Sequence, residues 1–82
     1  MTKEAIKSIL KNISDDYRDN KNFVMYTVNC DSTKVFATSI KNCGSIYCNA
    51  IRIDNTDLLE FYNDGKIIAI FDYSVIEKIY LL

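Results

Sequence analysis

The stretch TKEAIKSILKNISDDY, residues 2–17, repeats its apolar side chains with the period of an α-helix. Five of them fall at positions i, i+3, i+4, i+7 and i+11 of one stripe: Ile6, Ile9, Leu10, Ile13 and Tyr17. Thr2 can cap the first turn, and the carboxylate of Glu4 suits the positive end of the helix dipole. We therefore predict a helix over residues 3–17, followed by a polar exit loop over residues 18–22.

An amphipathic helix of this length is marginal in water unless its apolar stripe packs against a partner. The rest of the chain has the residue pattern of β-strands, so the expected partner is a sheet. This combination predicts an α+β fold in two layers, with the N-terminal helix packed on a five- to six-stranded antiparallel meander. A meander that curls into a small barrel is the alternative form of the same fold.

From residue 23 onward, aromatic and β-branched residues are separated by turn residues every eight to twelve positions. The expected turns include Asp31–Ser32 and the sequence Asn63-Asp64-Gly65, which is the strongest hairpin signal in the chain. The pattern predicts five strands, at residues 23–30, 33–40, 45–53, 58–62 and 66–71.

The end of the chain contains two segments with a less regular pattern. Residues 67–71 are apolar on both faces of a strand, which favours a central position or a corner where both faces are covered. Residues 74–82 fit a short helix opened by the capping box Ser74 to Glu77, or one turn followed by a strand. We favour the turn and strand, because the chain is too short there for a stable helix.

The composition favours one domain over residues 1–82 and disfavours several classes of function. Hydrophobic residues make up 49% of the chain, charged residues 26%, and the net charge is −1, which suits a folded chain but not a general polyanion binder. Histidine is absent and both glycines fit turns, so the commonest general base, the commonest metal ligand and a glycine-rich phosphate loop are missing. We expect no catalytic residue, no metal site and no cofactor, and predict that the protein is not an enzyme.

The three cysteines, Cys30, Cys43 and Cys48, cannot all pair within one chain. Without histidine they make an incomplete zinc site, so we expect buried free thiols in a reducing compartment. Residues 1–10 lack the continuous apolar stretch of a secretory signal, and no apolar run is long enough to cross a membrane. We therefore expect a cytoplasmic protein with no membrane partner.

Six tyrosines are a high number for 82 residues, and most fall in or beside predicted strands. Tyrosine is enriched in protein interfaces and can also stack on bases, but only two arginines accompany the tyrosines here. We expect most of the rings to pack in the core or at its rim. Anchoring of a protein partner is the next interpretation, ahead of base stacking. The candidate anchors are Tyr47, Tyr62, Tyr73 and Tyr80.

Carboxylates cluster around the turns that flank the fourth predicted strand, where they could form an acidic rim. The segment from Asp54 to Asp57 lacks the glycine and the spacing of a calcium loop. The candidate partner-binding carboxylates are Asp54, Asp57, Glu60 and Asp64. A second charged feature, the stripe formed by Lys3, Lys7 and Lys11, is expected to be a solvated helix face.

These observations favour a small non-enzymatic protein-binding module whose partner is another protein. Residues with AT-rich codons (Ile, Lys, Asn and Tyr) supply 34 of the 82 positions, which suggests a phage or mobile-element accessory protein that inhibits or modulates a host protein complex. A homodimer through an edge strand or through the apolar tail at residues 80–82 is a natural extension.

Two other classes of function remain as alternatives. The order of a helix and five short strands resembles small barrels of the Sm or SH3 kind in architecture only, since no motif residues support membership. The first alternative is therefore a nucleic-acid-binding small β-barrel that takes single-stranded DNA or RNA, and nucleic acid is the less favoured partner. The second is a carboxylate-dependent enzyme.

Overall fold

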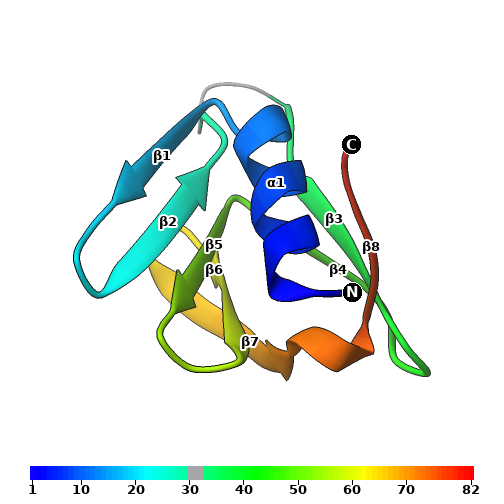
Figure 1. Cartoon of the computed structure of the whole chain (residues 1–82). Coiled ribbons are helices and arrows are strands. Elements are labelled where there is room, and N and C mark those ends of the chain that lie inside the picture. The colour runs from blue at the N-terminus through cyan, green and yellow to red at the C-terminus, as the bar shows by residue number, and fades with distance from the viewer. Residues whose placement is uncertain (30–32) are drawn as a thin grey trace.

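The computed structural model describes residues 1–29 and 33–82, which form one α-helix, one 3-10 helix and eight antiparallel strands (Figure 1). The predicted tight turn at Asp31–Ser32 and the predicted strand end at Cys30 lie outside the described residues. In chain order the elements are α1 (Lys3–Ile13), β1 (Asp16–Asp19), β2 (Phe23–Thr27), β3 (Phe36–Ile40), β4 (Gly44–Cys48), β5 (Ala50–Asp54), β6 (Leu58–Asn63), β7 (Lys66–Asp72), the 3-10 helix η1 (Tyr73–Val75) and β8 (Ile76–Leu81).

The strands form two sheets instead of the single meander that the sequence predicts. One sheet has five strands in the order β1-β2-β5-β6-β7, and the other has three in the order β4-β3-β8. The helix α1 lies across the molecule, with the β1–β2 hairpin on one side and β3 and β8 on the other (Figure 1). The α+β class and the antiparallel pairing are confirmed. The part of the chain that the structure describes shows no closed barrel.

The helix is capped as expected but ends earlier than predicted. The hydroxyl of Thr2 accepts a hydrogen bond from the backbone of Ala5 (3.2 Å), and the last turn closes at Ser14. The prediction that the helix reaches residue 17 is wrong, and so is the assignment of residues 18 and 19 to a loop. Residues 16–19 form β1 instead. The negative C-terminal end of the helix dipole disfavours the carboxylates that follow residue 14. The backbone of residues 16–19 forms its hydrogen bonds with β2 instead of continuing the helix.

A single residue, Asn49, breaks the predicted strand at residues 45–53 into β4 and β5. Its backbone N–H donates to the side chain of Asn63 (3.0 Å), and its side-chain amide donates to Asp64 (3.2 Å). These bonds fasten the break to the β6–β7 turn, so the chain leaves one sheet and enters the other at this point. The strand predicted at residues 33–40 begins only at Phe36.

The turn and strand predicted for the end of the chain are confirmed. The carboxylate of Asp72 caps the 3-10 helix η1 by accepting the backbone N–H of Ser74 (2.8 Å), and β8 follows directly. Strand β8 pairs with β3, which lies near the middle of the sequence, and Leu81 lies opposite Phe36. This long-range pairing brings the last strand against the helix.

The predicted central position of residues 66–71 is wrong, because β7 is an edge strand of the five-stranded sheet. Its side chains Ile67, Ile68 and Ile70 are 48%, 47% and 50% exposed. A bulge opposite Phe61 and Tyr62 adds one residue to β7 at this point. An apolar run shows that a strand is suited to burial on both faces. Whether both faces are buried depends on which other elements pack against the strand.

The core lies between α1 and the inner faces of the two sheets. Its largest fully buried hydrophobic side chains come from the helix and from both sheets: Ile6, Leu10, Phe36, Ile51, Ile53, Leu59, Phe61 and Ile76. The remaining face of the five-stranded sheet is turned away from this core, and that geometry positions the candidate site.

Candidate functional site

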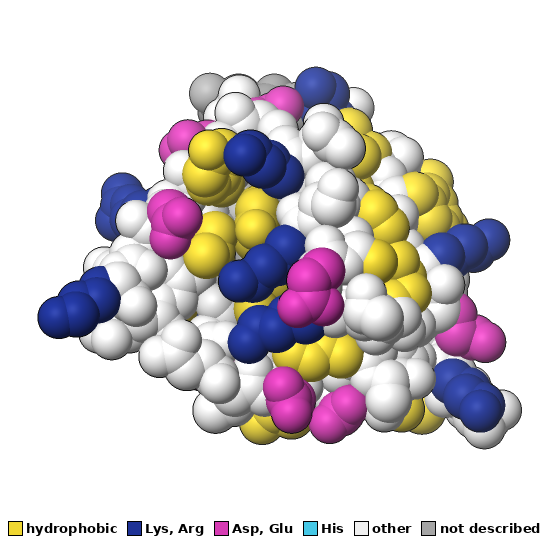
Figure 2. Space-filling view, viewed as in Figure 1, with side chains coloured by type: hydrophobic (Ala, Val, Ile, Leu, Met, Phe, Trp, Pro, Cys, Tyr) yellow, Lys and Arg dark blue, Asp and Glu magenta, His cyan; other side chains and the backbone are white. Residues whose placement is uncertain are grey.

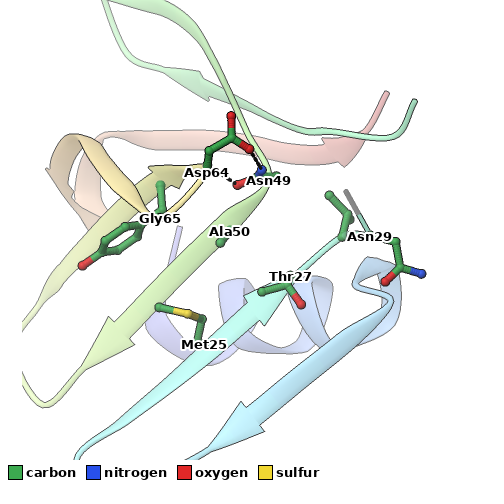
Figure 3. Close-up of a pocket in the computed structure, with 9 residues that line it drawn as sticks. Met25, Thr27, Asn29, Asn49, Ala50, Asp64 and Gly65 are labelled. Carbon is green, nitrogen blue, oxygen red and sulfur yellow. Dashed lines mark hydrogen bonds between the residues drawn. The ribbon is translucent and has the colours of Figure 1, made fainter. Parts of the chain in front are cut away.

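The face of the five-stranded sheet opposite α1 is the candidate site, and we refer to it as the outer sheet face. Side chains alternate between the two faces of a strand, so the neighbours of the buried residues Tyr26, Ile51 and Phe61 point away from the core. In Figure 3, Met25 and Ala50 lie on this face while α1 lies behind the sheet. The outer sheet face consists of Phe23, Met25, Ala50, Arg52, Leu58, Glu60, Tyr62, Ile67 and Ile70.

A hydrogen-bonded network occupies the centre of the outer sheet face. The Nη1 atom of Arg52 donates to Oε1 of Glu60 (2.9 Å), and the hydroxyl of Tyr62 donates to the same oxygen (2.7 Å). The guanidinium of Arg52 also lies over the ring of Phe23, 4.5 Å from its centre. These contacts hold the side chains against one another, and side chains ordered in this way lose less entropy when a surface is buried.

The network also shifts the pKa values of Arg52 and Tyr62. The hydrogen bond to Glu60 raises the pKa of the Arg52 guanidinium above its usual value. The same carboxylate raises the pKa of the Tyr62 phenol, because losing the proton would break its hydrogen bond to Glu60. At neutral pH the face therefore presents a protonated tyrosine and a charged arginine that share one carboxylate.

An open hollow of about 560 Å³ adjoins the network, between β2, β5 and the β6–β7 turn (Figure 3). Met25, Ala50 and Tyr62 form apolar parts of its lining, and Asn49 and Asp64 form one wall. Their mutual hydrogen bonds, 3.2 and 3.3 Å long, hold that wall in place. The hollow is therefore a preformed, mainly apolar depression that a side chain of a partner is able to enter.

The structure divides the predicted site residues between separate surfaces. Tyr62, Glu60 and Asp54 lie together on or beside the outer sheet face, and Asp64 lies at the hollow. Asp57 is exposed in the loop between β5 and β6. The other predicted residues are tyrosines placed elsewhere: Tyr47, Tyr73 and Tyr80.

Tyr47 and Tyr80 lie on the other sheet, on either side of Ala37 of β3, and are 50% and 37% exposed. Tyr73 is buried in η1, with 5% of its surface exposed, so it is not available to a partner in this conformation. Burial raises the pKa of the Tyr73 phenol to about 12. These three tyrosines therefore do not belong to the outer sheet face.

Sequence reasoning did not identify Phe23, Met25 or Arg52 as site residues. The available signal was strand alternation, because Phe23 and Met25 alternate along β2 with Val24 and Tyr26, which face the core. The pairing of β2 with β5, which places Met25 opposite Arg52, was not readable from the sequence.

The candidate carboxylates are not gathered into a catalytic or metal-binding cluster. Of the predicted carboxylates, the hollow beside the network contains Asp64, and a separate hollow of about 160 Å³ near the start of α1 contains Asp54. Within residues 1–29 and 33–82, no three Asp, Glu or Cys side chains are placed to hold a metal ion. The predicted carboxylates are therefore divided between separate surfaces.

The lysines of α1 form a mixed surface and not a purely basic one. In Figure 2, Lys and Arg side chains over the helix alternate with Asp, Glu and hydrophobic side chains. The ammonium of Lys3 lies 5.8 Å from the ring centre of Tyr73, and that of Lys11 lies 5.6 Å from the ring centre of Tyr17. Both lysines therefore cover aromatic rings of their own chain, as expected of a solvated helix face.

The prediction of buried thiols is correct for Cys48 and wrong for Cys43, and Cys30 lies outside the described residues. Cys43 is exposed because it lies in the β3–β4 turn, next to Asn42 and Gly44, which have φ angles of 64° and 85°. Burial raises the pKa of the Cys48 thiol to about 12.

We therefore expect iodoacetamide at about pH 8 to alkylate Cys43 and to spare Cys48 in the folded protein. With a pKa of about 12, only about one Cys48 thiol in ten thousand is ionised at that pH, and the thiolate is the reactive form. Peptide mass spectrometry measures each site separately, and protein unfolded in urea serves as the control in which both react. Equal labelling rates at the two sites in folded protein would contradict the buried position of Cys48.

Comparisons with protein-family models, with curated proteins and with solved structures found no match to this chain. In the described part of the chain, no helix combines the length and the apolar character that crossing a bilayer requires.

Proposed function

We propose that this protein is a small non-enzymatic module that binds another protein through its outer sheet face. The observation that carries the proposal is the ordered Arg52–Glu60–Tyr62 network, whose three side chains are half-buried on the outer sheet face. Arginine, tyrosine and methionine are the residue types enriched at interface centres, and they lie here beside a preformed hollow. Exposed apolar side chains along the rim, Leu58 and Ile70, add to the surface available for burial.

Charge supports a protein with a basic rim as the partner. The outward-facing positions of the five strands carry four carboxylates, from Asp16, Asp54, Glu60 and Asp72, against two guanidinium groups, from Arg18 and Arg52. The resulting charge of −2 repels phosphate backbones and attracts lysine and arginine. This balance favours the protein partner over the alternative of a nucleic-acid-binding small β-barrel.

We expect the double substitution Met25→Ala and Tyr62→Ala to weaken partner binding by about a hundredfold or more, because it removes the centre of the face. A tagged pull-down from the source organism, followed by mass spectrometry, identifies the partner, and titration with the purified partner gives the affinity. The matched control is Tyr47→Ala with Tyr80→Ala, which removes two exposed rings from the other sheet.

A partner that the control variant retains and the Met25/Tyr62 variant loses supports the proposal. Equal binding by both variants, or loss in the control alone, contradicts it. Salt-sensitive binding of single-stranded DNA or RNA that the Met25/Tyr62 variant loses would establish the alternative. Circular dichroism of each variant verifies that it is folded.

We further propose a cytoplasmic accessory role, in which a phage or mobile-element protein of this kind inhibits or modulates a host protein complex. The free thiols of Cys43 and Cys48 support a reducing compartment. The codon composition of the chain supports the phage or mobile-element origin. The pull-down described above tests this role, because recovery of a host complex is expected and recovery of extracellular proteins alone would contradict it.

A further inference from the structure

The hollow between β2, β5 and the β6–β7 turn exists because small side chains lie at its centre. Ala50 of β5 lies opposite Thr27 of β2 on one side and opposite Tyr62 of β6 on the other, so this row across the outer sheet face has two small side chains beside a large one. Met25 lies two residues along β2 on the same face. The hollow of about 560 Å³ is therefore a gap in the side-chain layer, bounded by the longer side chains of Met25 and Tyr62.

Asp64 gives this hollow a negative charge that the chain itself does not neutralise. Among the described residues that line the hollow, Asp64 is the one with a charged side chain. Its Oδ1 atom accepts the hydrogen bond from Asn49 that Figure 3 shows, whereas its Oδ2 atom accepts none from residues 1–29 and 33–82. Neither Asp64 nor the nearby Lys66 takes part in an ion pair with any described residue. An uncompensated carboxylate thus lies at the wall of a mainly apolar depression.

The adjoining hollow on the same face has a different charge balance. It has a volume of about 380 Å³ and shares Met25 and Thr27 with the first hollow. Its lining includes Asp16 and Arg18, one charge of each sign. Charge complementarity therefore assigns a cationic occupant to the first hollow and none to the second.

We propose that the first hollow receives an arginine side chain of the protein partner, an inference that rests on the proposed function of the outer sheet face. The methylene groups of an arginine suit contact with Met25 and Ala50, and its guanidinium suits pairing with Oδ2 of Asp64. Arginine is favoured over lysine because a guanidinium is less strongly hydrated than an ammonium group and stacks on aromatic rings such as that of Tyr62. An acidic side chain would be repelled by Asp64, and an aliphatic one would leave this charge unused.

Titration of the full chain with n-butylguanidinium tests the preference of the hollow directly. The backbone amide signals of Asn49, Ala50 and Gly65 in NMR spectra report binding there, and n-butanol, n-butylammonium and butyrate are the comparison probes. We expect n-butylguanidinium to bind about fivefold more tightly than n-butanol, more tightly than n-butylammonium, and most weakly butyrate. Equal affinities for n-butylguanidinium and n-butanol overturn the proposal, and so does tighter binding of n-butylammonium.

Asp64→Asn isolates the contribution of the charge, because asparagine tolerates the φ angle of 51° at this position and keeps an oxygen for Asn49. It is expected to lower the affinity for n-butylguanidinium about fivefold, to that of n-butanol. The matched control is Glu77→Gln, which removes an exposed carboxylate from the other sheet and should change nothing. An Asp64→Asn variant that keeps the full preference for n-butylguanidinium contradicts the assignment.

Ala50→Val tests the apolar part of the hollow. The larger side chain narrows the gap, so we expect the affinities for n-butylguanidinium and n-butanol to fall together, by about fivefold or more. The NMR spectrum of the variant verifies that it is folded. A folded Ala50→Val variant that binds both probes as before shows that they bind elsewhere, which overturns the proposal.

The purified partner gives the final comparison. Asp64→Asn is expected to raise its dissociation constant about fivefold, and Glu77→Gln is expected to leave it unchanged. A partner that the Met25/Tyr62 variant loses but that Asp64→Asn binds at full strength overturns this inference and leaves the proposed function standing. The probe titrations need no partner, so their outcome is separate from that of the pull-down.

Discussion

Replacing Phe61 by alanine is expected to lower the free energy of unfolding by about 3–5 kcal/mol. The ring is fully buried, and it pairs across the sheet with Ile51 on one side and Ala69 on the other. It also meets the ring of Phe71 edge to face, with 6.3 Å between the ring centres. Truncation removes all of these contacts and leaves a cavity. Strand β6 is hydrogen-bonded to β5 and β7 on its two sides, so the backbone is not free to move in and fill that cavity.

This loss is large compared with the total stability of about 4–12 kcal/mol expected for a domain of this length. Urea denaturation followed by circular dichroism measures it, provided that the slope of the transition is unchanged. The control is Tyr47→Ala, which removes a half-exposed ring of similar size and should cost about 1 kcal/mol or less. Equal losses in the two variants would mean that Phe61 is not the centre of the core.

Replacing Leu10 by alanine is expected to cost about 2–5 kcal/mol, because this side chain carries the contact between α1 and the sheets. Leu10 and Ile6 are the fully buried residues of the helix, whereas Ile9 is only partly buried against the core. The substitution does not reduce helix propensity, since alanine is the best helix former. The measured loss therefore reports tertiary packing and not the intrinsic stability of the helix.

Ile9→Ala is the matched control, since it removes a side chain of the same size from the same helix. We expect it to cost about 1–2 kcal/mol, in proportion to its smaller burial. Chemical denaturation of the two variants under identical conditions gives the comparison. A larger loss at Ile9 than at Leu10 would show that the helix is rotated relative to the arrangement described above.

The start of the helix and the β6–β7 turn were predictable from local sequence. Thr2 satisfies a backbone donor three residues ahead, whatever the rest of the chain does. The Asn63-Asp64-Gly65 sequence turns because Asp64 and Gly65 adopt φ angles of 51° and 79°, and residues of these types accept such angles. In both cases the controlling contacts lie within a few residues of each other.

The candidate site was only partly predictable, because it depends on which strands become neighbours. The sequence indicated Tyr62 and Glu60, but their link to Arg52 requires the pairing of β5 with β6. Tyr73 resembles the other tyrosines in the sequence, yet it is buried in η1. Side-chain type indicates what a residue is able to bind, whereas neighbours decide whether it is accessible.

The amino-acid sequence by itself determined an α+β chain with a capped N-terminal helix and β-strands separated by tight turns. Periodicity and turn chemistry are local properties, and local free energies of about 1 kcal/mol are enough to select them. Only the tertiary structure decided that the chain divides into two sheets at Asn49, that residues 16–19 become a strand, and that β7 stays at an edge. Those choices depend on contacts between residues far apart in the chain. In the core, the side chains of α1 pack against residues of both sheets, and no local property of the sequence specifies that packing.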